Sequence, residues 1–189
     1  PWKNSKNMNI ESIVNNNNLP GTGLSYFGLD NYGAGRNLAS MTIADGNLGS
    51  NDTVLVYGAF IEGAPGADVA KGAVDVLTDA GVAFDTLQWS NEAVADPSLS
   101  VPVMVAYLET NPNTKAIIVP GHGGITAVLD KVLKDAGKAP GSVITSGFDI
   151  SPGAIQGVKD GYITTVLDQQ PYLQGFLPII AAVLEKKYG

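Results

Sequence analysis

Two groups in the sequence have the chemistry to bind or act on a small molecule: a lone histidine in a glycine-rich turn and a carboxylate that ends an apolar run. His122, the only histidine, lies in Gly121-His122-Gly123-Gly124. It could bind a ligand, or act as a general base beside a nucleophile or carboxylate. Because the sequence holds no HExxH, GxSxG or Walker motif, we interpret His122 as a loop residue or a ligand contact and predict that the protein is not an enzyme.

The glycine-rich turn could also be a phosphate cradle, because it follows a strand-like run and precedes a helical one. It lacks the GxGxxG spacing, and no Lys-Ser or Lys-Thr pair follows it. We therefore favour a tight strand-to-helix turn over a nucleotide site.

Asp149 and Trp89 each allow a structural and a functional interpretation. Asp149 ends the run Ser146-Gly147-Phe148-Asp149 and precedes Ser151-Pro152, so it is either a turn or N-cap aspartate or a carboxylate that accepts hydrogen bonds from ligand hydroxyls. Trp89 ends another strand-like run. It is either a core residue or an aromatic face for the apolar side of a sugar, and the sequence leaves both pairs of alternatives open.

The composition excludes several classes of site and partner. The chain has 189 residues, no cysteine, a formal net charge of −7 and 11 Lys and Arg without a basic cluster. The lack of cysteine excludes thiolate catalysis, disulfides and Cys-based metal sites, and we expect no cofactor and no metal. The acidic balance argues against a nucleic-acid partner. No apolar run reaches the roughly 18 residues of a membrane span, so none is expected.

Strand-like and helix-like segments alternate along most of the chain. Short apolar, β-branched runs predict buried parallel strands at residues 24–28, 53–58, 83–89, 116–120, 143–148 and 163–167. Apolar residues at helical spacing predict helices between them at residues 32–44, 69–80, 99–107, 125–136 and 151–159. This alternation predicts an α/β fold with a doubly wound parallel sheet.

Such sheets bind ligands in the loops beyond the carboxyl ends of their strands. Here those loops combine neutral polar groups, aromatic rings and a few carboxylates, among them residues 28–31, Phe60, Trp89, His122, Asp149 and residues 168–170. This set suits a hydroxyl-rich, uncharged ligand better than a phosphate.

Several stretches match one family. The most specific is 168–175, Asp-Gln-Gln-Pro-Tyr-Leu-Gln-Gly, supported by 26–35, Asn111-Pro112, 135–138 and Gly147-Phe148-Asp149. With them, residues 14–188 resemble the second lobe and hinge-flanking pieces of the type I periplasmic solute-binding proteins of ABC sugar transporters, the group that contains the ribose-binding proteins. The resemblance implies a Rossmann-like lobe whose partner, the first lobe, is largely missing from this chain.

The resemblance implies a function, a partner and a location. It implies the substrate-binding component of an ABC transporter, which binds a sugar, polyol or sugar-like small molecule in a hinge cleft and delivers it to a membrane permease. It implies a periplasmic or extracellular location, with a lipoprotein as one form. The ligand-binding residues that it implies are Asn15, Asn16, Asp149 and Gln169, to which the residue chemistry adds Trp89 and His122.

Two departures from the family concern the ligand. The family's ligand-contacting arginine falls near Ala67 or Asp68, and neither can replace a guanidinium. Lys71 is close in sequence but is expected to face elsewhere. The family's asparagine at the start of the glycine-rich turn is Gly121 here. A sugar other than ribose, a polyol or a sugar-like signal is therefore favoured.

The resemblance also implies three segments. Residues 1–18 would be a remnant of the first lobe with the first hinge strand, residues 19–170 the C-terminal ligand-binding lobe, and residues 171–189 a helix that packs on the first lobe. That helix is apolar around much of its circumference, and we expect Pro178 to kink it. Three covers for it stay open: the Asn-rich N-terminal segment, a second copy of the chain, or a first lobe.

A rival function from another class is the effector-binding domain of a LacI-type transcriptional repressor, which shares the fold. A repressor would need a helix-turn-helix and a hinge helix upstream, and the Asn-rich start provides neither. The stretch 168–175 also resembles the transport branch more closely.

Overall fold

The computed structural model describes residues 13–15, 25–64 and 66–188. The chain divides into two compact units: Asp30–Asp168 forms the larger one, and Pro1–Leu29 together with Gln169–Gly189 forms the smaller one. The three segments expected from the sequence, residues 1–18, 19–170 and 171–189, stay predictions.

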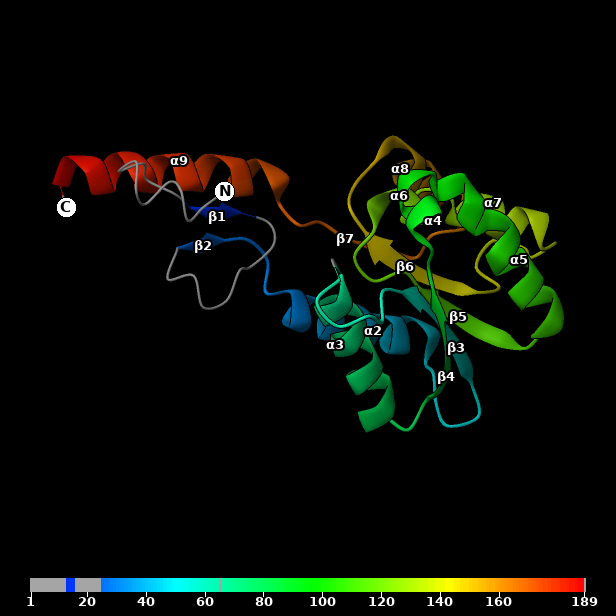
Figure 1. Ribbon diagram of the computed structural model, residues 1–189. Helices are drawn as coiled ribbons and strands as arrows, with labels where there is room; N and C mark the ends of the chain where they lie inside the picture. Colours follow the sequence, from blue (N-terminus) through cyan, green and yellow to red (C-terminus); the bar gives the residue numbers. More distant parts are fainter. Residues whose placement is uncertain (1–12, 16–24, 65, 189) are drawn as a thin grey trace. The chain divides into compact units, whose positions relative to one another are not determined.

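The larger unit is built on a sheet of five parallel strands. β3 (Thr53–Gly58), β4 (Ala83–Gln88), β5 (Thr114–Ile118), β6 (Ile144–Phe148) and β7 (Thr165–Leu167) lie in the order β4-β3-β5-β6-β7, and every neighbouring pair is parallel. Most residues of β3, β5 and β6 are buried, as in strands covered on both faces. The structure confirms the predicted α/β fold with a doubly wound parallel sheet (Figure 1).

Helices connect the strands and cover both faces of the sheet (Figure 1). One face carries α2 (Asn31–Gly46) and α3 (Ala67–Asp79), and the other carries α5 (Ser100–Thr110), α7 (Leu129–Asp135) and α8 (Pro152–Lys159). The main core cluster joins Leu55 and Tyr57 of β3 to Met104 and Leu108 of α5 and to Leu133 of α7. Burial of these side chains stabilises the unit by roughly 1.5–3 kcal/mol for each large apolar group.

Two glycines allow α2 and α3 to pack backbone against backbone. A Cβ atom at Gly72 would lie 2.2 Å from the carbonyl oxygen of Tyr32, and one at Gly35 would lie 2.0 Å from that of Val69. Real Cβ atoms do not approach so closely, so only glycine permits this crossing. At the start of α2, the Asp30 carboxylate accepts a 3.0 Å hydrogen bond from the backbone N–H of Gly33 and caps the helix.

Several elements of the structure differ from the predicted ones. The strand predicted at residues 163–167 is shorter, because β7 begins at Thr165. The strand predicted at residues 116–120 runs from Thr114 to Ile118. The helix predicted at residues 125–136 is two helices, α6 (Gly123–Thr126) and α7, because Val128 has non-helical backbone angles of φ −105° and ψ 3°. A short helix that periodicity could not reveal, α4 (Asn91–Ala95), is capped by Ser90 and followed by the 3-10 helix η1 (Pro97–Leu99).

The described part of the smaller unit contains two short strands and one long helix. β1 (Val14–Asn15) pairs in parallel with β2 (Tyr26–Phe27), and α9 (Pro171–Tyr188) contacts both. α9 continues through Pro178 as one helix and has no buried residue. Its exposed apolar side chains include Phe176, Ile179 and Val183. Their cover by the N-terminal segment, a second copy of the chain or a first lobe remains a prediction. No helix within the described ranges is long and apolar enough to cross a membrane.

Candidate ligand-binding site

The candidate site lies at the carboxyl edge of the five-stranded sheet. The chain passes from β3 to β4 on one side, while β5 lies on the other side of β3, so the strand order reverses between β3 and β5. In open α/β sheets, ligands bind beyond the carboxyl ends of the strands at such a reversal. Trp89, His122 and Asp149 lie on the segments that follow β4, β5 and β6.

His122 is the N-cap of α6. Its Nδ1 accepts a 3.1 Å hydrogen bond from the backbone N–H of Ile125. Its carbonyl oxygen accepts both the backbone N–H of Thr126, at 3.0 Å, and the Thr126 hydroxyl, at 3.1 Å. Gly121 precedes it with φ +92°, a conformation that glycine adopts without strain. Side chain and backbone of His122 are therefore both held by the turn that the sequence predicts.

Trp89 is a core residue that contacts the His122 ring. It is 6% exposed, and its ring meets those of Tyr57 and His122 edge-on, at centroid distances of 6.2 and 5.6 Å. Such edge-to-face pairs are favourable by about 0.5–1.5 kcal/mol. The Trp89 ring therefore contacts Tyr57 and His122 inside the protein. A stacking role against a ligand remains a prediction.

Asp149 has a strained backbone and lies against the glycine-rich turn. Its φ of +65° is in the left-handed region, which costs a residue other than glycine free energy, although Asp and Asn tolerate it better than other residues. Its N–H donates to the carbonyl oxygen of Leu167 at 2.9 Å. The cap of α8 is Ser151, whose hydroxyl oxygen accepts the N–H of Ala154 at 3.2 Å. The N-cap role that the sequence left open for Asp149 therefore belongs to Ser151.

Thr126 links the two segments that carry His122 and Asp149. Its hydroxyl donates to the His122 carbonyl at 3.1 Å and accepts the backbone N–H of Phe148 at 3.0 Å. Thr126 is fully buried, and Gly147 lies close to it, because a Cβ at Gly147 would be 2.3 Å from Thr126 Oγ1. Sequence reasoning missed this residue, although its spacing of four from His122 was a usable signal.

The other residues predicted to bind ligand belong to the smaller unit or lie outside the described residues. Asn15 ends β1 and is exposed. Gln169 follows β7, and its carbonyl oxygen accepts a 2.7 Å hydrogen bond from the Gln174 amide. Asn16 lies outside the described residues. The structure therefore brings together Trp89, His122 and Asp149, while the roles of Asn15, Asn16 and Gln169 stay predictions.

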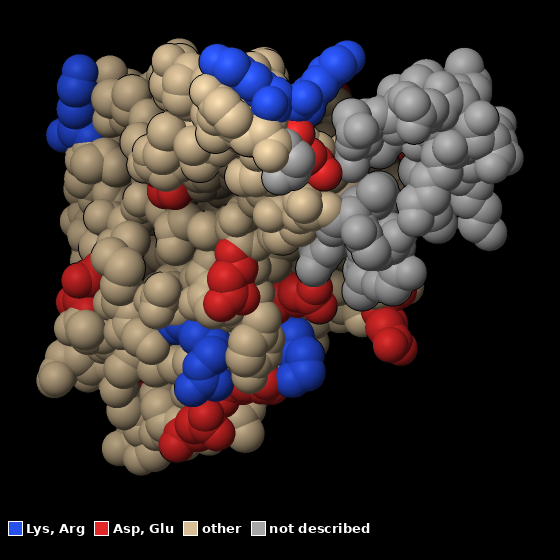
Figure 2. Space-filling model, turned by 90° about the vertical axis from the view of Figure 1, so that its left-hand side faces the viewer, with Lys and Arg blue, Asp and Glu red and all other residues tan. Residues whose placement is uncertain are grey.

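Lys71, which lies near the position of the family's arginine in the sequence, is engaged on its own helix. Its ammonium group forms an ion pair with Asp75 on the same helix, and Asp75 also accepts the Tyr32 hydroxyl at 2.8 Å. The hydrogen bond to Asp75 raises the pKa of Lys71, while the hydrogen bonds from Lys71 and Tyr32 lower the pKa of Asp75. Basic and acidic side chains are interspersed on the face that Figure 2 shows. On α3, Lys71 and Asp75 form one such pair of opposite charges.

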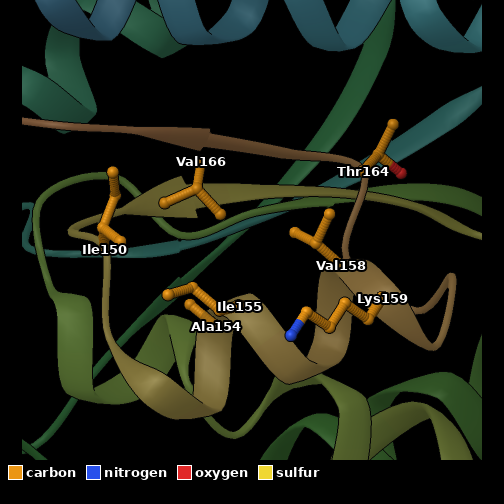
Figure 3. Close-up of a pocket in the computed structure, with 7 residues that line it drawn as sticks. All are labelled: Ile150, Ala154, Ile155, Val158, Lys159, Thr164 and Val166. Atoms are coloured by element: carbon orange, nitrogen blue, oxygen red, sulfur yellow. The ribbon is translucent and has the colours of Figure 1, made fainter.

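A hollow lies between α8 and β7, and we call it the apolar groove (Figure 3). It has a volume of about 440 Å³ and is lined by Ile150, Ala154, Ile155, Val158, Lys159, Thr164 and Val166. Only Lys159 and Thr164 among these carry polar side-chain atoms. A hydroxyl-rich ligand would lose hydration there without regaining hydrogen bonds, so the groove is a poor sugar site.

Comparisons with known proteins identify the family and the fold. The family model described as periplasmic binding protein domain matches residues 3–187. The xylose/arabinose-binding protein XylF of Sulfolobus acidocaldarius is 36% identical over 83 residues, which are 42% of this chain and 20% of that protein. The crystal structure of an ABC transporter solute-binding protein from Burkholderia graminis in complex with D-arabinose superimposes with a TM-score of 0.83 and 24% identity, over 98% of this chain and 64% of that one.

The same fold occurs outside transport. A probable maltose operon transcriptional repressor from Staphylococcus superimposes with a TM-score of 0.74 at 20% identity, over 98% of this chain and 64% of the repressor. The part of this chain that matches XylF thus spans about a fifth of that protein. The chain spans under two thirds of each of the two solved structures. Because the family model covers nearly all of the sequence, the chain belongs to the periplasmic binding protein domain family, whose members are periplasmic or extracellular.

Proposed function

We propose that this chain is the ligand-binding portion of the sugar-binding component of an ABC transporter. The observation that carries the proposal is the carboxyl-edge pair of His122 and Asp149, held by Thr126 at the reversal of strand order. The 36% identity with a xylose/arabinose-binding protein supports a sugar as the ligand.

The chemistry of the two side chains fits a neutral polyol. An ionised carboxylate only accepts hydrogen bonds, so Asp149 would accept them from ligand hydroxyl groups. A phosphate would be repelled by the same carboxylate, and no arginine stands at residues 67 or 68 to offset it. The proposed role is binding and delivery to a membrane permease, outside the cytoplasmic membrane, without catalysis.

Calorimetry with D-xylose, D-arabinose, D-ribose and D-allose tests the proposal. For the sugar that binds, Asp149→Ala should weaken binding by about 1.5–3 kcal/mol, roughly 10- to 150-fold, because a hydrogen bond to a charged group is lost. The control Asp135→Ala removes an exposed carboxylate whose ion pair with Lys131 lies within α7, and it should leave affinity unchanged. Lack of binding by every sugar, or equal affinity in Asp149→Ala, would contradict the proposal.

The repressor remains the second candidate, because the Staphylococcus repressor shares the fold. Operator binding by a protein that carries this chain would favour it, whereas a neighbouring permease and ATPase gene would favour transport. Steady turnover of a sugar derivative that disappears in His122→Ala would overturn both binding roles in favour of an enzyme.

A further inference from the structure

We propose that His122 is a fixed hydrogen-bond donor for the ligand: its ring proton is held on Nε2, and Nε2–H donates to a ligand hydroxyl oxygen. The assignment of the proton follows from the contacts of the ring alone. The ligand half of the inference rests on the proposed sugar-binding function.

The N-cap contact determines the tautomer. Nδ1 of His122 accepts the backbone N–H of Ile125 at 3.1 Å. A backbone N–H can only donate, so Nδ1 must offer a lone pair and carry no proton. A neutral imidazole carries one ring proton, which leaves it on Nε2. The other tautomer would place two hydrogens between the same two nitrogens.

The surroundings hold the ring in place. Trp89 meets it edge-on, with centroids 5.6 Å apart and planes at 69°. On another side, a Cβ at Gly124 would lie only 3.2 Å from His122 Cε1, so the ring lies close above the glycine backbone. Within the described residues, the bond from Ile125 is the one hydrogen bond of the imidazole. His122 is half-buried, and Nε2–H has no hydrogen-bond acceptor among the described residues, so it is free to donate to a ligand or water.

His122 and Asp149 then make complementary demands on the ligand. The carboxylate accepts from a hydroxyl, while Nε2–H donates to an oxygen. Their segments touch, because a Cβ at Gly123, the residue after His122, would lie 2.6 Å from Asp149 Oδ2. The ligand class that meets both demands is a neutral polyol with neighbouring hydroxyls, one donating to Asp149 and one accepting from His122.

The tautomer can be measured without any ligand. His122 is the only histidine, so the imidazole ¹⁵N signals of the labelled 189-residue chain, at a pH where the ring is neutral, belong to this residue alone. We expect Nδ1 at the chemical shift of an unprotonated nitrogen and Nε2 at that of a protonated one. The reverse assignment, or averaged shifts from two exchanging tautomers, would overturn the inference even if sugar binds.

Two substitutions separate capping from ligand binding. Serine is a good N-cap but is too short to replace Nε2–H, whereas alanine can do neither. We expect His122→Ser to keep the unfolding midpoint of the parent and His122→Ala to lower it. Both should bind D-xylose or D-arabinose, whichever the parent binds, at least tenfold more weakly. Parent-like affinity in His122→Ser would show that Nε2–H does not reach the ligand, and the donor role would fail while the sugar-binding function stood.

Discussion

The carboxylate of Asp149 lies directly against the backbone of Gly123. A Cβ atom at Gly123 would be 2.5 Å from Asp149 Cβ and 2.6 Å from its Oδ2, closer than any real contact. The glycine after His122 is therefore what lets the carboxylate and the imidazole occupy adjoining positions at the carboxyl edge of the sheet.

Gly123→Ala should displace the Asp149 carboxylate and weaken sugar binding. We expect affinity to fall about tenfold or more, since the hydrogen bond to a charged group is misplaced. Calorimetry with the sugar that binds the parent measures this. The matched control is Gly49→Ala, because a Cβ at Gly49 would meet nothing within 4 Å. Equal affinity in both variants would show that Asp149 does not contact the ligand.

Thr126→Val should destabilise the larger unit while preserving the shape of the side chain. The substitution leaves the buried N–H of Phe148 without its acceptor, which costs about 1–3 kcal/mol. Urea denaturation gives the loss in unfolding free energy. Thr78→Val is the matched control, because that exposed hydroxyl donates to the Val74 carbonyl of its own helix. A difference of less than about 0.5 kcal/mol between the two would contradict this role of Thr126.

Gly72→Ala should force α2 and α3 apart. Its Cβ would be placed 2.2 Å from the carbonyl oxygen of Tyr32, and overpacking of this kind costs about 1–3 kcal/mol. Thermal unfolding compares it with Thr78→Ala, a substitution at an exposed position of the same helix. An unfolding midpoint of Gly72→Ala at or above that of the parent would contradict the close approach of α2 and α3.

Tyr107 should make stability fall in strongly alkaline solution. Burial raises the pKa of Tyr107 from 10.0 to about 12, helped by its 2.7 Å hydrogen bond to the Asp85 carboxylate. Between pH 10 and pH 12 the unfolded chain has lost the phenolic proton and the folded chain still holds it. The free energy of unfolding therefore decreases as the pH rises. The contribution of the protonated Tyr107 phenol to the free energy of unfolding is complete below pH 10 and is lost as the pH passes 12.

Tyr107→Phe is the comparison that isolates this effect. It cannot ionise, so its unfolding free energy should fall less steeply than that of the parent between pH 10 and pH 12. Denaturant unfolding at several pH values in that range measures both slopes. Identical slopes would mean that Tyr107 ionises as readily in the folded chain as in the unfolded one.

The sheet was predictable from the sequence because its strands are buried on both faces. Val54, Leu55 and Val56 form a continuous apolar run, and Ile117 and Ile118 form another, so composition and length alone identify them. The break at Val128 was not predictable, because the apolar residues on both sides keep helical spacing. Only backbone angles reveal that one helix ends there.

The residue types of the candidate site follow from the sequence, whereas the contacts between these residues do not. Placement after a strand singles out Trp89, His122 and Asp149. The N-cap bond of the imidazole joins residues only three apart in the chain, whereas the approach of Gly123 to Asp149 is a tertiary contact. No local pattern encodes the second contact, because it joins segments after two different strands. The burial of Trp89 likewise depends on Tyr57, which is distant in sequence.

The most direct measurement of the central claim is a map of backbone amide chemical shifts during titration with the sugar that binds most tightly among D-xylose, D-arabinose, D-ribose and D-allose. We predict saturable shifts that are largest, within the larger unit, at residues 121–126 and 148–151, the two segments that carry His122 and Asp149. Saturable shifts confined to the apolar groove between α8 and β7, or no saturable shift with any of these sugars, would contradict a sugar site at the carboxyl edge of the sheet.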